Sequence, residues 1–129
     1  MFAADSMIHV VDDDDAGRDT LRVLRESYGL QVEEFSSADA YLAALPPNDK
    51  ACLLLDIHMP GASGVELLNK LRARGNKIPA VIVSGRVDDT IQQAAQANGA
   101  VAVLHKPVRE AELMASIVVA LRASGLTAA

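Results

Sequence analysis

The sequence contains few aromatic residues and a single cysteine. Two tyrosines, two phenylalanines and no tryptophan occur among 129 residues, so a core must be built from aliphatic side chains. Cys52 cannot form a disulfide within the chain, which favours a reducing compartment. No apolar run approaches the ~20 residues of a membrane span, and the net charge of −5 lacks the excess of Lys and Arg typical of nucleic-acid surfaces. We therefore expect a cytoplasmic protein that binds neither membrane nor nucleic acid directly.

The chain alternates short β-rich runs with helical patterns five times. Strands are predicted at 8–11, 32–35, 52–55, 80–83 and 101–104, and helices at about 16–28, 38–45, 64–74, 90–98 and 110–123. This alternation predicts an α/β fold in which helices cover both faces of an open, doubly wound parallel sheet of five strands. One domain should span 7–124, with residues 1–6 extended or disordered and residues 125–129 frayed.

Polar residues gather at the carboxyl ends of the predicted strands, where ligands bind in such sheets. The first strand is followed by four aspartates that begin with Asp12 and Asp13, and the third by Asp56. Ser84 follows the fourth strand and Lys106 the fifth. An aspartate run after a strand is more often a loop and a helix N-cap, but the combination on four strands favours a functional site.

These residue types suit phosphoryl transfer. Carboxylates on neighbouring strands repel by about 4 kcal/mol at ~4 Å and an effective dielectric near ~20, and a hard cation such as Mg²⁺ removes that cost. Asp56 could then act as a carboxylate nucleophile, with Lys106 and Ser84 binding the phosphoryl oxygens. A cis bond before Pro107 would direct Lys106 inward, since X–Pro bonds are the ones for which cis is accessible.

Several motifs resemble the response-regulator receiver family over about residues 7–123. They are Val10-Val11-Asp12-Asp13, Asp56-x-x-Met59-Pro60-Gly61-x-x-Gly64, Ile82-Val83-Ser84-Gly85 and Lys106-Pro107. The sequence around Phe35-Ser36-Ser37-Ala38 is most similar to the FixJ-type subgroup, in which a receiver usually precedes a helix-turn-helix DNA-binding domain. The resemblance implies a flavodoxin-like CheY fold with strand order 2-1-3-4-5. The chain would be either a stand-alone receiver or a piece of a longer regulator.

The resemblance also implies a function in two-component signal transduction. Asp56 would accept a phosphoryl group from a sensor histidine kinase, a phosphotransfer protein or a small acyl phosphate. Asp13, Asp56 and the backbone carbonyl of His58 would bind Mg²⁺ or Mn²⁺, with Asp12 acting through water. Ser84 and Lys106 would sense the phosphate. The receiver would catalyse its own phosphorylation and dephosphorylation and switch conformation to control an output, and it would be no conventional enzyme beyond that.

Three positions depart from the family pattern or tune it. Val103 stands where a switch aromatic is expected, three residues before Lys106, and a valine cannot swing a ring. His58 and Arg86, two residues beyond Asp56 and Ser84, would flank the approach of a hydrolytic water and tune the lifetime of the phosphoryl group.

The last two helices predict a partner surface. Ile91 is the single large apolar residue of the fourth helix, which should therefore shift easily. In the fifth helix Met114, Val118 and Val119 are predicted to lie partly outside the inward stripe. We hypothesise that the face formed by the fourth helix, fifth strand and fifth helix binds a partner or a second copy, against the alternative of scattered exposed apolar residues.

Other functions match the residues less well. A haloacid-dehalogenase-type phosphatase also has an Asp-x-Asp after its first strand, as Asp12 and Asp14 provide, but only Glu110 and Glu112 could serve as its later acidic pair. A pseudo-receiver that only binds partners would explain Val103. A nucleotide-binding fold fails because acidic residues, not a glycine-rich loop, follow the first strand.

Overall fold

The structure, a computed structural model, describes residues 6–12, 22–44, 51–56, 64–85 and 89–123. The strands are β1 (Met7–Val11), β2 (Gln31–Phe35), β3 (Ala51–Asp56), β4 (Ala80–Ser84) and β5 (Ala102–His105). The helices are η2 (Val23–Ser27), α2 (Ala38–Ala44), α3 (Gly64–Ala73), α4 (Asp89–Ala97) and α5 (Glu110–Ala123). No helix in the described ranges is long and apolar enough to cross a membrane.

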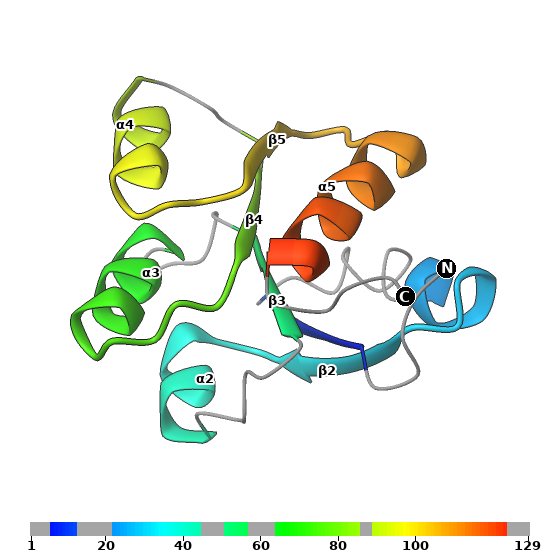
Figure 1. Ribbon diagram of the computed structural model, residues 1–129, viewed down its shortest axis with the longest axis horizontal. Helices are drawn as coiled ribbons and strands as arrows, with labels where there is room; N and C mark the ends of the chain where they lie inside the picture. The colour runs from blue at the N-terminus through cyan, green and yellow to red at the C-terminus, as the bar shows by residue number, and fades with distance from the viewer. Residues whose placement is uncertain (1–5, 13–21, 45–50, 57–63, 86–88, 124–129) are drawn as a thin grey trace.

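The five strands form one parallel sheet in the order β2-β1-β3-β4-β5, as the sequence predicts. Figure 1 shows α2, α3 and α4 on one side of this sheet and α5 with η2 on the other. The order reverses at β1, where the chain moves first to β2 and then back past β1 to β3. In such folds the crevice for ligands lies at this reversal, outside the carboxyl ends of the strands.

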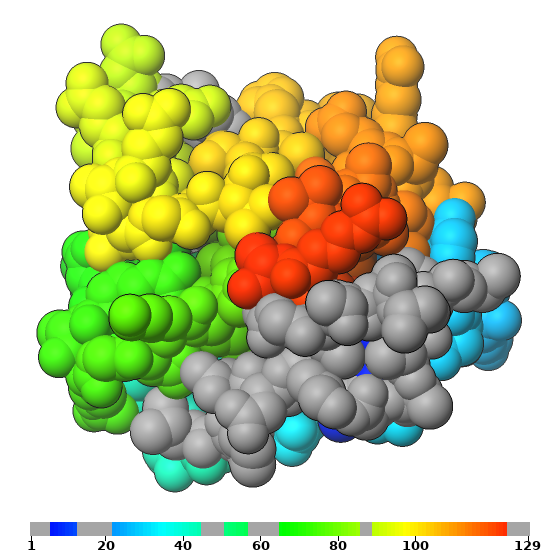
Figure 2. Space-filling view, viewed as in Figure 1, coloured from blue at the N-terminus to red at the C-terminus, as the bar shows by residue number. Residues whose placement is uncertain are grey.

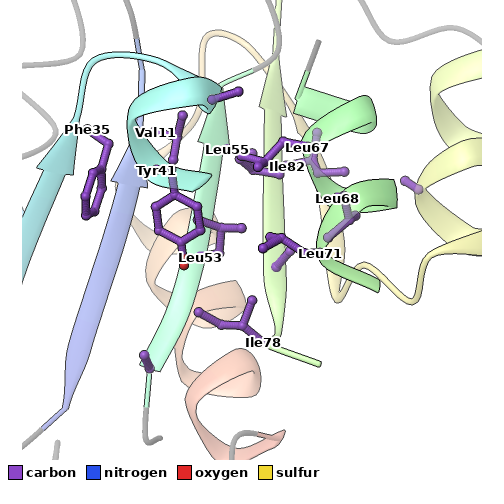
Figure 3. Close-up of a cluster of buried hydrophobic side chains, with 14 residues drawn as sticks. Val11, Phe35, Tyr41, Leu53, Leu55, Leu67, Leu68, Leu71, Ile78 and Ile82 are labelled. Carbon is purple, nitrogen blue, oxygen red and sulfur yellow. The ribbon is translucent and has the colours of Figure 1, made fainter. Parts of the chain in front are cut away.

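Each face of the sheet carries its own apolar core. Ile8, Cys52 and Leu54 pack beneath α5, together with Leu113 and Ile117 of that helix. The other core contains the alternate residues of the same strands and the apolar side of α3. Figure 3 shows Leu67 and Leu71 pointing to Leu55 and Ile82 of the sheet. All six residues of β3 are buried, which explains why this strand reads as a continuous apolar run.

Helix ends follow the expected signals. The hydroxyl oxygen of Ser37 accepts a hydrogen bond of 3.0 Å from the amide of Ala40, so this serine caps α2. Gly75 and Gly99 have φ values of +77° and +69° just past α3 and α4, a conformation that favours glycine. The first predicted helix differs. Its described part is a π-helical turn at Val23–Ser27 instead of an α-helix, and the rest of that prediction lies outside the described residues.

The prediction for α5 is wrong at one residue. Met114 is 8% exposed and belongs to the core beneath α5, so it is not part of an outer surface. The reason is its spacing, because Met114 precedes Ile117 by three residues and Leu121 by seven and therefore lies on the same helix face. Val118 is half-buried, and Val119 is exposed at 53%.

Candidate functional site

The strand register places the predicted site residues at neighbouring levels of the sheet. Val11 pairs with Leu55, so Asp12 follows β1 at the level of Asp56. Asp56 in turn pairs with Val83, and Ser84 pairs with His105. Asp12 and Asp56 therefore lie at the same level of the sheet. Ser84 lies one position further toward the carboxyl edge, and Lys106 one position beyond Ser84. Four residues far apart in the sequence meet at one edge.

Asp56 and Lys106 form an ion pair at this edge. The ammonium nitrogen Nζ of Lys106 lies 2.5 Å from Oδ2 of Asp56, and their side chains are 32% and 11% exposed. The amide of Lys106 also donates a 2.8 Å hydrogen bond to the carbonyl oxygen of Ser84, and the Lys106–Pro107 peptide bond is cis. Ser84 itself is 1% exposed. A shielded carboxylate thus lies beside a cation that still reaches solvent.

A buried polar pair lies within the fold, at a residue of β1 that precedes Asp12 by three positions. His9 is 1% exposed, and its Nδ1 forms a 2.9 Å hydrogen bond with the Tyr41 hydroxyl. The Phe35 ring packs edge-on against both of these rings, and the Phe35 carbonyl accepts a 3.1 Å hydrogen bond from the Asp12 amide. Burial lowers the pKa of His9, which the carboxylate of Glu33 partly offsets, and burial also raises the pKa of Tyr41.

The donor atoms at the edge suit a hard divalent cation. Asp12 and Asp56 supply carboxylate oxygens from adjacent strands, and Mg²⁺ prefers one or two such groups while it retains several waters. Within the described ranges no three His, Cys, Asp or Glu side chains are grouped closely enough to form a metal site. Asp13 and His58, the other predicted ligands, lie outside the described residues.

The remaining predicted residues have the following places. Arg86 lies outside the described residues. Val103 is half-buried and packs against the core beneath α3, where it pairs with Ile82, two positions before Ser84 in β4. Sequence reasoning missed two features near the site, the ion pair of Asp56 with Lys106 and the contact of His9 with Tyr41. A histidine within a strand of apolar residues was the available signal for the second.

Comparison with known proteins decides the family. A family model described as "Response regulator receiver domain" matches residues 8–118. The chain belongs to this family. The receiver is 42% identical over 110 residues to the transcriptional regulatory protein FixJ of Azorhizobium caulinodans, which covers 85% of this chain and 52% of that protein. It is 39% identical over 117 residues to the response regulator protein TodT of Pseudomonas putida, covering 91% and 52% of the two chains.

Solved structures agree with these similarities. The receiver superposes on the structure titled FixJ-N with a TM-score of 0.81 and 32% identity, covering 98% of this chain and 99% of the other. The chain spans about half the length of the curated relatives that it matches. It is therefore a FixJ- and TodT-like receiver domain of two-component systems, with the predicted flavodoxin-like topology.

Proposed function

We propose that Asp56 accepts a phosphoryl group in a Mg²⁺-dependent reaction and that the receiver then changes conformation to control an output. The observation that supports this most directly is the ion pair of Asp56 with Lys106, beside Asp12 and Ser84 at the carboxyl edge of the sheet. Membership of the receiver family agrees with it.

The residues divide the reaction among them. A carboxylate oxygen of Asp56 attacks the phosphorus of the donor. A bond between that oxygen and phosphorus forms, giving an acyl phosphate, and the bond from phosphorus to the donor's leaving group breaks. With acetyl phosphate the leaving group is acetate, and with a phosphohistidine it is an imidazole that takes up a proton. Lys106, held next to Asp56, can bind an oxygen of the incoming phosphoryl group. The hydroxyl group of Ser84 can donate a hydrogen bond to another such oxygen.

We assign the metal to the acidic group. Asp56 and Asp13, with the His58 carbonyl, would bind Mg²⁺ or Mn²⁺ directly, and Asp12 would bind it through water. When bound, the cation neutralises the phosphoryl oxygens and the clustered carboxylates. His58 and Arg86 would then tune the lifetime of the phosphoryl group. Because Val103 stands at the position of the switch aromatic, the conformational change would proceed without rotation of an aromatic ring there. The hydrogen bond that the Asp12 amide donates to the Phe35 carbonyl oxygen fixes the backbone at the start of this acidic group.

The partners follow from the same proposal. A sensor histidine kinase or a phosphotransfer protein would supply the phosphoryl group, in keeping with membership of the receiver family. The one cysteine is a free, buried thiol, which suits a cytoplasmic location. The relatives FixJ of Azorhizobium caulinodans and of Bradyrhizobium are named transcriptional regulators, so a transcriptional output is the output we favour. The domain would comprise 7–124.

The test is direct phosphorylation in vitro. The protein is incubated with Mg²⁺ and acetyl phosphate, its intact mass is measured, and the modified residue is mapped. We expect one phosphoryl group on Asp56, lost in Asp56→Asn and on addition of EDTA. Asp39→Asn is the matched control, because it makes the same exchange at an exposed carboxylate in the first turn of α2. It should be phosphorylated like the unaltered chain.

Three other results would change the proposal. A phosphoryl group that persists in Asp56→Asn would mean that another residue is the acceptor. A stable adduct on Asp12 would indicate a phosphatase of the haloacid-dehalogenase type. No adduct from a folded protein at any donor concentration would indicate a pseudo-receiver that acts through binding alone.

A further inference from the structure

The carboxyl ends of α3 and α4 are built in the same way. After α3, the amide of Asn76 donates to the carbonyl of Leu71 at 2.9 Å and the amide of Gly75 to that of Arg72 at 3.0 Å. After α4, the amide of Ala100 donates to the carbonyl of Ala95 at 2.9 Å, and that of Gly99 to Gln96 at 3.1 Å. Both are Schellman motifs with a left-handed glycine, and they satisfy the last carbonyl groups of each helix.

Arg72 connects these two helix ends. Its Nε donates to the carbonyl oxygen of Asn98, directly after α4, at 2.8 Å. Its Nη1 donates to the carbonyl oxygens of Asn76 at 3.1 Å and Ile78 at 2.8 Å, in the segment that leads from α3 into β4. One half-buried guanidinium thus holds the end of α3, the end of α4 and the entry to β4 together. The planar fork of an arginine holds five N–H donors in fixed directions, whereas the donors of a lysine are crowded on one rotatable ammonium nitrogen.

The position of this cation is favourable for a second reason. The carbonyl groups at a helix carboxyl end carry partial negative charge, and a cation there stabilises the helix. Arg72 lies in the last turn of α3 and contacts the residue that follows the last turn of α4. Burial lowers the pKa of the Arg72 guanidinium because the group is partly withdrawn from water. The same withdrawal strengthens its hydrogen bonds to the neutral carbonyl groups. The side chain of Asn98 adds a 2.8 Å bond to the Ala94 carbonyl.

The rest of α4 makes few buried apolar contacts. Of its nine residues, all within the described part of the chain, Ala95 alone is buried, and Ala95 lies in the carboxyl-terminal half. Asp89 and Thr90 at the amino end are exposed, and Ile91 is half-buried. Figure 2 shows α4 in yellow as a projection at one corner of the molecule, above the green surface of α3. Helices with few buried apolar contacts open or shift at low cost.

The two ends of α4 therefore differ in restraint. The amino end follows Ser84 through residues 85–88 only, so it lies next in the chain to the edge that carries Asp56 and Lys106. The carboxyl end is fixed to α3 and to the entry of β4 by Arg72. We infer that Arg72 is the pivot of α4, about which the amino end of the helix swings when Ser84 and Lys106 change their contacts. This use of the pivot in signalling rests on the proposed function, whereas the anchoring of one end does not.

Amide hydrogen exchange of the unmodified protein tests the anchoring. Helix ends normally fray, so an ordinary helix exchanges faster at its ends than in its middle. We expect the opposite at the carboxyl end of α4, where the amides of Asn98 and Ala100 should exchange more slowly than those of Gln93 and Ala94. Replacing Arg72 by Met keeps the aliphatic stem and removes the fork. It should speed exchange at Asn98 and Ala100 by roughly tenfold to a hundredfold, as expected for loss of charged hydrogen bonds.

Two variants make the result specific. Arg74→Met removes an exposed guanidinium two residues further along the chain, directly after α3, and should leave exchange in α4 unchanged. Arg72→Lys keeps the charge but cannot span the three carbonyl groups, so it should behave like Arg72→Met if geometry matters and like the unaltered chain if charge alone does. If Arg72→Met does not fold, the exchange order within the unaltered α4 still decides, because frayed amides at Asn98 and Ala100 would overturn the inference.

Treatment with Mg²⁺ and acetyl phosphate tests the swing. With the adduct on Asp56 verified by mass, amide chemical shifts should change more at Thr90 and Ile91 than at Gly99 and Ala100. In Arg72→Met the changes should extend to both ends. Equal changes at both ends of the unaltered helix, or none, would overturn the pivot while leaving the proposed function intact. Absence of the adduct would instead contradict the proposed function, and the exchange experiment on the untreated protein would still judge the anchoring.

Discussion

The buried pair of His9 with Tyr41 makes the stability of the receiver sensitive to mild acid. His9 is 1% exposed, and burial lowers its pKa from 6.5. The folded chain therefore binds a proton at His9 less readily than the unfolded chain does. As the pH falls below 6.5 the unfolded state takes up the proton first, so the free energy of unfolding decreases. The decrease stops growing once the pH passes below the folded pKa.

The size of this effect follows from linkage. A histidine whose pKa is lower in the folded than in the unfolded chain loses stability as the pH falls below 6.5, by about 1.4 kcal/mol for each pH unit that separates the two pKa values. The neighbouring Glu33, which pairs with His9 in the register of β1 and β2, raises the pKa and so reduces the loss. Carboxylates contribute mainly at lower pH, because their ordinary pKa values lie near ~4.

Urea unfolding monitored by circular dichroism at several pH values measures the effect. The double variant His9→Phe/Tyr41→Phe replaces both hydrogen-bonding partners with apolar rings of similar shape, which should cost little stability and remove the pH dependence in this window. Tyr41→Phe alone leaves the buried Nδ1 without its partner and should cost about 1–3 kcal/mol at neutral pH. The unaltered His105, which is exposed, remains in every variant. This reasoning would be refuted if lowering the pH reduced the free energy of unfolding of the double variant as much as that of the unaltered chain.

Three further predictions concern stability, reactivity and association. Leu68→Ala should lower the free energy of unfolding by about 2–5 kcal/mol, since Leu68 is fully buried against the sheet, whereas the exposed Asn69→Ala should change it by less than about 0.5 kcal/mol; equal effects in urea titrations would contradict the described core. The Cys52 thiol, whose pKa burial raises to about 12, should resist a disulfide reagent until the chain is unfolded, and rapid labelling of the native protein would be inconsistent with its burial. Val119→Glu should leave stability unchanged and reduce self-association if the face of α4, β5 and α5 pairs with a second copy; sedimentation that shows no difference at any concentration would rule that pairing out.

The fold was predictable because its signals are local. Continuous apolar runs such as residues 52–55 indicate strands covered on both faces, and Gly75 and Gly99 mark helix ends within a few residues. The meeting of Asp56 and Lys106 was predictable at lower detail, because parallel strands bring their carboxyl ends to one edge. Their direct ion pair was not, since side-chain contacts over 50 residues of sequence depend on the register.

What the sequence left open is tertiary in origin. The spacing of Met114 places it on the same helix face as Ile117 and Leu121, but how far across that face burial extends depends on how broadly the sheet beneath α5 is apolar. The Nε hydrogen bond of Arg72 joins its side chain to a backbone carbonyl group 26 residues away, and every residue has such a carbonyl group, so the sequence does not single out this partner. The contact of His9 with Tyr41 spans 32 residues and required the docking of α2 on β1.

The complete burial of β3 has a consequence for how the sheet finds its alignment. In a strand with one polar face, a slip by one residue turns polar side chains into the core, and that cost defines the register. β3 is apolar on both faces, so a slip would exchange one set of apolar side chains for another. What would change is the level of Asp56, which would leave its place beside Asp12 and lose its contact with Lys106. The residue that we propose to carry the signal therefore also marks the correct alignment of the central strand.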